Sequence, residues 1–148
     1  MSRGFQTVST YLDKNIRLPQ RKTALPAGYD LEAAETVTIP PKGTAKIPTG
    51  LKAYMEPDEV LYVHARSSLF ATKGCMLVNS VAVIDADYYD NPGNEGHILI
   101  SLLNLGDESV TLQKGERFAQ GIFQKYLKTD DDFPAGTVRR GGYGSTGQ

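Results

Sequence analysis

The chain has 148 residues, and its 16 basic and 17 acidic residues leave a net charge of −1. This length favours a single domain, the balanced charge excludes polyanion binding driven by overall charge, and the single cysteine, Cys75, excludes a disulfide framework and a multi-cysteine zinc site. The 15 Gly and 8 Pro are so widely spread that the longest stretch without either covers residues 75–91. Because both residue types disfavour helix interiors, we expect many short elements joined by turns.

Strand signals dominate from residue 36 to residue 127. Runs of β-branched and aromatic residues alternate there with turn-forming Gly, Pro and Asn. The predicted strands cover residues 36–39, 44–49, 51–55, 60–65, 81–84, 98–103, 109–112 and 117–127. Short strands at this spacing indicate an all-β sandwich or barrel.

Outside these strands, residues 67–73, closed by Gly74, form the best candidate for a short helix. Residues 1–27 carry five scattered cations against one acid, which predicts a solvated or interface segment. Residues 128–134 interrupt the strand pattern and are typical of a linker. No apolar run has the length of a secretory signal core or of a membrane span, so we expect a cytoplasmic protein without a membrane partner.

The chain ends in the glycine-rich stretch Gly141-Gly-Tyr-Gly-Ser-Thr-Gly147. It contains the spacing G-x-G-x-x-G, but a dinucleotide site also needs a helix after this motif, and the chain stops at Gln148. Two interpretations remain open. The stretch is either a flexible tail or a clamp, in which Arg139 or Arg140 and backbone N–H groups hold an anion while Tyr143 stacks on a flat ring.

Acidic residues gather in the segment 85–95, which is dense in oxygen ligands. A calcium loop needs Gly where Asp90 stands, so we reject direct calcium binding. One remaining interpretation is an acidic hairpin turn. The other concerns Asp85, which directly follows the apolar run 81–84. A carboxylate at the end of a buried strand is held rigidly, as a general base must be.

The tripeptide Arg66-Ser67-Ser68 lies between a predicted strand and the predicted helix. A guanidinium, two hydroxyls and a helix N-terminus can together bind phosphate. The alternative is an N-capping serine beside a surface arginine. His64 and His97 have no cysteine or suitably spaced histidine partner, so we do not expect a histidine-based zinc site.

Five segments of the chain, taken in order, resemble the motifs of the trimeric dUTP diphosphatases (dUTPases). They are Ala27-Gly-Tyr-Asp-Leu-Glu-Ala33, Arg66-Ser-Ser-Leu69, residues 79–88 ending in Val83-Ile-Asp-Ala-Asp-Tyr88, Lys114-Gly-Glu-Arg-Phe-Ala-Gln-Gly121 and Arg140-Gly-Gly-Tyr-Gly-Ser-Thr-Gly147. Any one of them is a weak signal, but five in the family's order at suitable spacing are specific. Residues 16–19 also resemble the family's first strand.

The resemblance implies a jelly-roll β fold with at most one short helix, assembled as a homotrimer whose active sites are shared between subunits. It implies that residues 1–133 form the β domain, and that residues 134–148 form a flexible lid which closes over a site from a third chain. It also implies Mg²⁺-dependent hydrolysis of dUTP to dUMP and pyrophosphate. This reaction keeps uracil out of DNA and supplies dUMP, and it calls for no nucleic-acid partner.

The same resemblance assigns roles residue by residue. Asp85 matches the general base that activates a water for attack on the α-phosphorus. Tyr88 matches the ring beneath the deoxyribose, where a 2′-hydroxyl would clash, and Asn79 and the backbone near Leu99 match the hairpin that reads uracil. Asp30 matches a carboxylate that holds Mg²⁺ through water, which suits an ion that dehydrates reluctantly.

The remaining assignments concern the phosphates and the tail. The residues that match phosphate contacts are Arg66, Ser67, Ser68 and Gln120. In the tail, Tyr143 takes the place of the aromatic residue that covers uracil, with Gly144 and Ser145 beside it, and either Arg139 or Arg140 is the phosphate clamp. A tail that orders only over substrate is both flexible and functional, so the two interpretations of the glycine-rich stretch are compatible.

The sequence departs from the family pattern in three places. Val81-Ala82 replaces a Pro-Gly pair, the insert 89–95 replaces a short turn, and Arg139-Arg140 directly precedes the glycine pair. Because the insert follows Tyr88, it can alter the hairpin that binds sugar and base, or serve a regulatory protein partner.

Two rival functions are kept beside the hydrolase. A dCTP deaminase, alone or bifunctional, shares the fold, but it needs a further catalytic acid in the base pocket, and the family tail argues against it. A nucleotide-responsive regulatory protein retains the fold without hydrolysis. Intact Asp85, Tyr88 and tail motifs favour catalysis, because a pure binder needs no general base.

Overall fold

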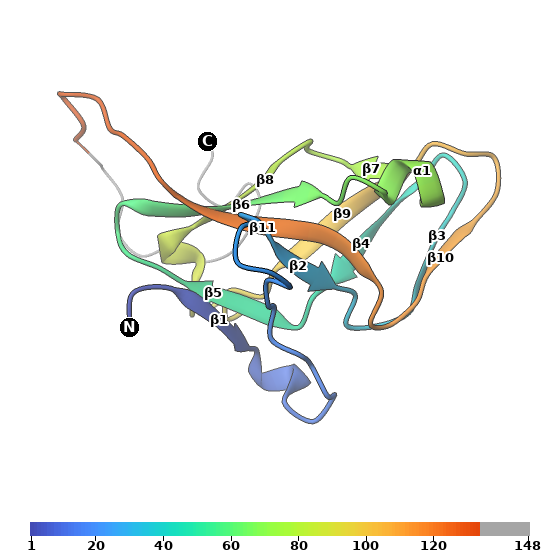
Figure 1. Ribbon diagram of the computed structural model, residues 1–148, viewed down its shortest axis with the longest axis horizontal. Coiled ribbons are helices and arrows are strands. Elements are labelled where there is room, and N and C mark those ends of the chain that lie inside the picture. Colours follow the sequence, from blue (N-terminus) through green and yellow to red (C-terminus); the bar gives the residue numbers. More distant parts are fainter. Residues whose placement is uncertain (134–148) are drawn as a thin grey trace.

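The computed structural model describes residues 1–133 and consists mainly of strands, with one short α-helix (Figure 1). The strands are β1 (Gly4–Thr7), β2 (Tyr29–Glu32), β3 (Val37–Ile39), β4 (Thr44–Pro48), β5 (Leu51–Tyr54), β6 (Glu59–Ala65), β7 (Cys75–Leu77), β8 (Ala82–Asp85), β9 (Leu99–Asn104), β10 (Val110–Leu112) and β11 (Arg117–Lys125). The helical elements are α1 (Leu69–Lys73) and the 3-10 turns η1 (Ser9–Tyr11) and η2 (Ala86–Tyr88). Outside the described residues lie the predicted lid 134–148 and its candidate site residues Arg139, Arg140, Tyr143, Gly144 and Ser145.

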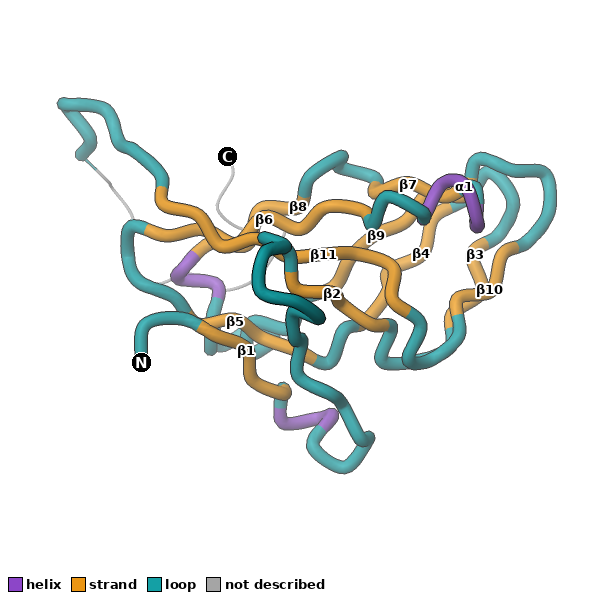
Figure 2. Tube along the Cα trace, viewed as in Figure 1, coloured by secondary structure: helices purple, strands orange, loops and turns teal. Residues whose placement is uncertain are grey.

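The strands pair antiparallel in four groups. A four-stranded sheet has the order β2-β11-β6-β8, a three-stranded sheet has the order β4-β9-β7, and β1-β5 and β10-β3 form two separate pairs. The long strand β11 runs along the body, with the β10-β3 pair at one end and the β1-β5 pair below the other end (Figure 1 and Figure 2). The prediction of a mostly β fold with one short helix is therefore confirmed. Among the helices of residues 1–133, none is long and apolar enough to cross a membrane.

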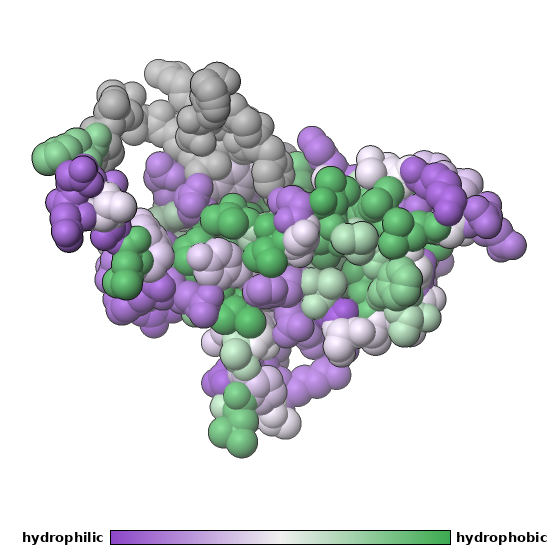
Figure 3. Space-filling model, turned by 90° about the horizontal axis from the view of Figure 1, so that it is seen from above, coloured by the Kyte–Doolittle hydropathy of each residue, from purple (hydrophilic) through white to green (hydrophobic). Residues whose placement is uncertain are grey.

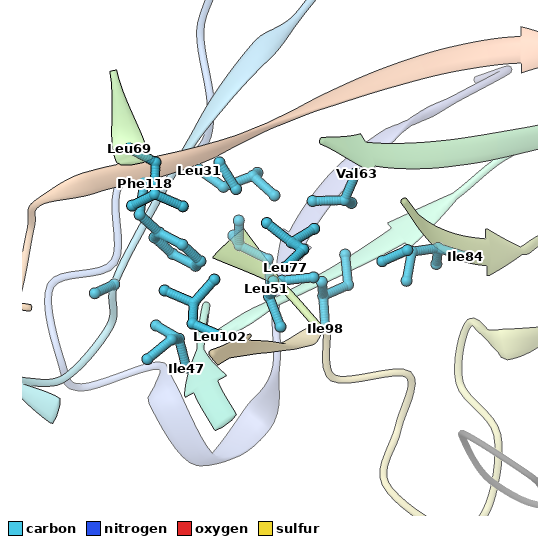
Figure 4. Close-up of a cluster of buried hydrophobic side chains, with 14 of the residues drawn as sticks. Leu31, Ile47, Leu51, Val63, Leu69, Leu77, Ile84, Ile98, Leu102 and Phe118 are labelled. Carbon is cyan, nitrogen blue, oxygen red and sulfur yellow. The ribbon is translucent and has the colours of Figure 1, made fainter. Parts of the chain in front are cut away.

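The hydrophobic core lies between the larger sheets, because each strand turns an apolar face inward. In β9, Ile100 and Leu102 are buried while Ser101 between them is only partly buried, the alternation that strand geometry imposes. Figure 4 shows Leu31 and Phe118 of the four-stranded sheet pointing into the same cluster as Leu102. Each buried side chain of this size stabilises the fold by about 1.5–3 kcal/mol.

Each of the eight predicted strand regions contains an observed strand, but other elements differ from expectation. β1 forms inside the segment 1–27, because it pairs with β5. β2 and β7 also form, through pairing with β11 and β9. Residues 16–19, which resemble a strand, form none, since Pro19 has no N–H for a ladder and Arg17 instead pairs with Glu32 at 2.8 Å. The helix begins at Leu69, not residue 67, and ends at Gly74 as predicted.

Candidate functional site

One group of candidate residues gathers where β6 ends. Antiparallel pairing places Gln120 of β11 opposite both Asp30 of β2 and His64 of β6, and Arg66 follows β6 directly. The Arg66 Nε lies 3.5 Å from the Asp30 Oδ1, and the Gln120 amide donates to the Ala65 carbonyl at 3.3 Å. We name this group the β6-end cluster, made up of Asp30, Arg66, Ser67, Ser68 and Gln120.

Local backbone geometry shapes the β6-end cluster. A Cβ on Gly28 would collide with the Gln120 side chain, so glycine lets the chain before β2 pass close to it. Ser67 and Ser68 are exposed in the turn between β6 and α1. Ser68 is the N-cap residue that precedes α1, but its side chain makes no capping hydrogen bond. The N-cap position of Ser68 therefore agrees with the alternative interpretation, although its hydroxyl does not cap the helix.

A cleft of about 570 Å³ adjoins the β6-end cluster. The cations that line it are Arg17, Arg66, Lys73 and Arg117. Arg17 is paired with Glu32 at 2.8 Å, and Lys73 with Glu116 at 3.1 Å. Four cations around one opening favour an anionic ligand. Sequence reasoning did not select Arg17, Lys73 or Arg117 for the site, although Arg117 stands inside the fourth motif.

A second group lies at the far end of the same sheet, where β8 ends. Asp85 pairs with Val60 near the beginning of β6, whereas Arg66 comes after the end of β6. Six residues of strand between these two levels correspond to about 20 Å. Tyr88 closes the η2 turn that follows Asp85. The structure therefore does not bring this β8-end cluster, Asp85 and Tyr88, together with the β6-end cluster of the same chain.

Strand alternation gives Asp85 its setting. Ala82 and Ile84 are buried, whereas Val83 is exposed and Asp85 is half-buried on the same outward face. The carboxylate is thus attached to a strand that the core holds in place, while it still reaches solvent. This is the local setting expected for a general base.

Tyr88 is held by Asn94 of the insert and by His97, which follows the insert. Its side chain is buried, its hydroxyl donates to the His97 carbonyl at 2.6 Å, and the Asn94 amide donates to that hydroxyl at 2.8 Å. The His97 Nε2 accepts from the Gly50 N–H at 2.9 Å. Burial lowers the pKa of His97, so the imidazole stays neutral at pH 7 and remains an acceptor.

Asn79 and Leu99 lie at one end of the pairing between β7 and β9 in the three-stranded sheet. The Val78 N–H donates to the Ser101 carbonyl at 3.0 Å, which extends the β7-β9 pairing into the turn that carries Asn79. Leu99 opens β9 two residues before Ser101, and Asn79 is exposed. These two candidates for uracil recognition therefore lie at the same end of the β7-β9 pairing.

The insert 89–95 folds back onto β5 and η1. The Lys52 Nζ of β5 forms ion pairs with Asp90 and, at 2.8 Å, with Glu95. Glu95 also accepts from the Ser9 hydroxyl at 2.6 Å. The hydrogen bonds from Lys52 and Ser9 lower the pKa of Glu95 to about 2. The insert therefore contacts the rest of the protein through Asp90 near its beginning and through Glu95 at its end.

The candidate metal residue, Asp30, is a single carboxylate beside Arg66. Within residues 1–133 no three His, Cys, Asp or Glu side chains gather to hold a metal ion. Mg²⁺ keeps several of its waters and is often bound through one carboxylate together with substrate phosphates. The donor set at Asp30 fits that mode of binding, and it does not fit a complete cage of protein ligands.

Comparisons with known proteins agree on one family. The family model described as dUTPase matches residues 14–147. A deoxyuridine 5'-triphosphate nucleotidohydrolase of Lactococcus lactis subsp. lactis (strain IL1403) is 51% identical over 146 residues, which cover 98% of this chain and 97% of that protein. The crystal structure of dUTPase from Streptococcus mutans has a TM-score of 0.82 at 50% identity, covering 86% of this chain and 98% of that chain. A mutant dUTPase from phage phi11 of S. aureus, described with a structural Mg(II) ion, is 19% identical and shares the fold with a TM-score of 0.73, covering 92% of this chain and 98% of that chain.

Proposed function

This chain belongs to the dUTPase family, and on that premise we propose how its residues carry out the family reaction. It is a dUTP diphosphatase, which hydrolyses dUTP to dUMP and pyrophosphate in nucleotide metabolism. The reaction keeps uracil out of DNA and supplies dUMP, and we place it in the cytoplasm. The observation that carries this function is the family match, which extends from residue 14 to residue 147 and includes all five motifs.

Asp85 acts as the general base. Its carboxylate accepts a proton from water while the water oxygen forms a bond to the α-phosphorus. The bond between that phosphorus and the oxygen that bridges to the β-phosphate breaks, and pyrophosphate leaves. The support is the position of Asp85 at the end of a strand with a buried face, which fixes the carboxylate on the outward, half-buried side of the strand.

The β6-end cluster binds the triphosphate. Arg66 supplies charge-assisted hydrogen bonds, and Ser67, Ser68 and Gln120 supply neutral donors. Negative charge develops on the leaving pyrophosphate, so preorganised cations and donors there lower the barrier. The cationic cleft beside the cluster supports this assignment.

Asp30 would hold Mg²⁺ through water, next to the side chains that bind phosphate. When bound, the ion neutralises phosphate charge and orients the triphosphate. The support is the chemistry of the donor set, one carboxylate beside the phosphate-binding residues.

Tyr88 and the neighbouring hairpin select the nucleoside. The buried ring lies beneath the deoxyribose and excludes a 2′-hydroxyl by its position. Asn79 and the backbone near Leu99 match the edge of uracil, reject cytosine by its donor pattern and leave little room for the methyl group of thymine. The support is that Asn79, in the turn after β7, and Leu99, at the start of β9, lie at the same end of the β7-β9 pairing.

The tail closes the site. Tyr143 covers the uracil with Gly144 and Ser145 beside it, and Arg139 or Arg140 clamps the phosphates. A glycine-rich segment that orders over bound substrate excludes water from the reaction. The support is the match of the fifth motif, which places one aromatic residue among glycines.

The active site is shared between copies in a homotrimer. The β8-end cluster of one copy meets the β6-end cluster of another, because about 20 Å of strand separates the two clusters within one chain. A second support is a set of exposed apolar side chains on and after α1, β7 and β8, namely Phe70, Met76, Val78 and Val83. Figure 3, which looks onto the molecule from above, shows hydrophobic residues gathered on one face. Exposed apolar side chains gathered on one face are typical of an interaction site.

The test uses the full chain with Mg²⁺ and supplies dUTP, dCTP, dTTP and UTP in parallel. We expect pyrophosphate release from dUTP and little from the other three nucleotides. Ammonia release from dCTP would identify a deaminase instead. Tight binding of nucleotide without any release of pyrophosphate would identify a regulatory protein.

A further inference from the structure

The hydroxyl of Tyr88 is held from two sides. It donates to the His97 carbonyl at 2.6 Å and accepts from the Asn94 Nδ2 at 2.8 Å. The hydroxyl lies on the long axis of the ring, so fixing this far end as well as the Cα fixes the direction of that axis and keeps the ring from tilting away. Asn94 belongs to the insert 89–95, for which the family motifs assign no contact with substrate.

Neighbouring groups determine which way the Asn94 amide faces. Its Oδ1 accepts from the Asn91 Nδ2 at 2.8 Å and from the Gly96 N–H at 3.1 Å. Turning the amide over would set its NH₂ group against both donors, so Nδ2 has to face Tyr88. Asn91 is itself 4% exposed, and its Oδ1 accepts from the N–H groups of Gly93 and Asn94.

The loop that carries Asn94 is closed at its base. The Asp90 N–H donates to the Glu95 carbonyl at 2.9 Å. Gly96 then turns with a φ of +89°, and a Cβ there would lie 2.7 Å from the Tyr88 carbonyl oxygen. Only glycine lets the backbone turn here and pass so close to the Tyr88 carbonyl. The loop therefore presents Asn94 to the Tyr88 hydroxyl from a rigid support.

We propose that Asn94 is a positioning residue, which fixes the Tyr88 ring and thereby sets how strongly the enzyme prefers deoxyribose over ribose. The inference rests on the proposed function, in which Tyr88 lies beneath the deoxyribose. A ring that rejects a 2′-hydroxyl by steric exclusion has to stay in place, because a ring that can tilt away makes room for the extra oxygen. Asn91, buried and bonded to Asn94, keeps the donor aimed at the ring.

The test compares kcat/KM for dUTP with kcat/KM for UTP in Asn94→Asp. Aspartate keeps the shape and the acceptor that Asn91 and Gly96 use, but it has no donor for the Tyr88 hydroxyl. We expect the ratio of the two kcat/KM values to fall about five- to tenfold, which is the worth of one hydrogen bond. The change comes mainly from faster turnover of UTP, which a general loss of stability would not produce.

Two further variants separate this role from a structural one. Glu95→Gln weakens the pairing with Lys52 on the other side of the same loop but keeps the bond to the Tyr88 hydroxyl, so we expect the wild-type ratio. Tyr88→Phe lacks the hydroxyl, so adding Asn94→Asp to it should change the ratio no further. An unchanged ratio in Asn94→Asp, or an equal fall in Glu95→Gln, overturns the proposal.

A binding measurement distinguishes failure of this proposal from failure of the proposed function. Calorimetric titration with dUMP and with UMP gives a sugar preference without turnover. If the wild type releases no pyrophosphate from dUTP but binds dUMP more tightly than UMP, the hydrolase function fails, and the ratio of affinities in Asn94→Asp still decides the role of Asn94. If the wild type binds dUMP and UMP equally, the proposal fails.

Discussion

The two ends of the four-stranded sheet hold their side chains in different ways. At the β6 end the Arg66–Asp30 contact measures 3.5 Å, and Ser67 and Ser68 are exposed. At the β8 end Tyr88 is 5% exposed and its hydroxyl makes two hydrogen bonds of 2.6 and 2.8 Å. The difference matches the two proposed tasks. Phosphates are recognised by charge, which acts over a range of distances, whereas deoxyribose and ribose differ by one oxygen and have to be told apart by a fixed shape.

The largest expected effect separates catalysis from binding at the β8 end. Asp85→Asn keeps the side-chain shape but removes the base, so we expect kcat for dUTP to fall about 10³-fold while nucleotide affinity stays largely intact. Pyrophosphate release measures the first quantity, and calorimetry with dUTP and the inactive variant measures the second. Asp107→Asn, which changes the same charge at a highly exposed position, is the matched control. If Asp85→Asn released pyrophosphate at a tenth of the wild-type rate or faster, Asp85 would be excluded as the general base.

A smaller loss is expected at the β6 end, where charge matters more than shape. Arg66→Ala should lower kcat/KM for dUTP about 10²-fold. We expect a smaller loss of kcat/KM for Arg66→Lys, because lysine keeps the positive charge and lacks only the bidentate hydrogen-bonding geometry of arginine. Measuring both variants at low and high salt checks the cause, since added salt screens the interaction of a partly exposed cation. Equal losses in the two variants would show that geometry, and not charge, governs this end as well.

Local signals account for much of the fold. Gly74 was expected to close the helix, and it does so in the left-handed conformation that helix ends favour. β1 lacks such a signal, because residues 4–7 become a strand only by pairing with β5, more than forty residues later in the chain. Residues 16–19 show the converse, since their likeness to a strand is not matched by any partner strand within residues 1–133.

The candidate site could be predicted residue by residue but not in its arrangement. Motif order selects Asp85 and Arg66, yet their placement at opposite ends of one sheet depends on the register between β6 and β8. The contact between Asn94 and Tyr88 is also invisible in the sequence, because no motif covers the insert 89–95. Whether that insert also serves a regulatory partner stays a prediction, as does the boundary between the β domain and the lid.

Mixing two defective variants tests whether the two ends meet between copies. Asp85→Asn and Arg66→Ala each lose activity alone. If the proposed trimer is correct, unfolding and refolding them together gives mixed assemblies in which roughly a quarter of the sites combine an intact Asp85 from one copy with an intact Arg66 from another. We expect a matching fraction of the wild-type rate of pyrophosphate release. No recovery in assemblies that are shown to be mixed would place both residues within one chain's site.

The smallest expected effect concerns the free energy of unfolding at low pH, where the Glu95 carboxylate that holds the insert becomes protonated. The pKa of Glu95 is about 2 because Lys52 and Ser9 form hydrogen bonds with its ionised carboxylate. In the unfolded chain the value returns to about 4.3. The stabilisation is therefore complete above pH 4.3 and is lost as the pH falls towards 2. Glu95 and its partners lie near solvent, so screening limits the contribution to the free energy of unfolding to about 1 kcal/mol.

Urea unfolding of wild type and Glu95→Gln at equal protein concentration measures this contribution. At pH 7 the wild type should be the more stable, and the difference in free energy should shrink between pH 4.3 and pH 2.5, because protonated Glu95 resembles glutamine. A difference that stays constant over this range would mean that the ionised carboxylate does not anchor the insert. Tyr88 would still be held by neutral hydrogen bonds, the one from Asn94 and the one to the His97 carbonyl, which do not depend on the charge of Glu95.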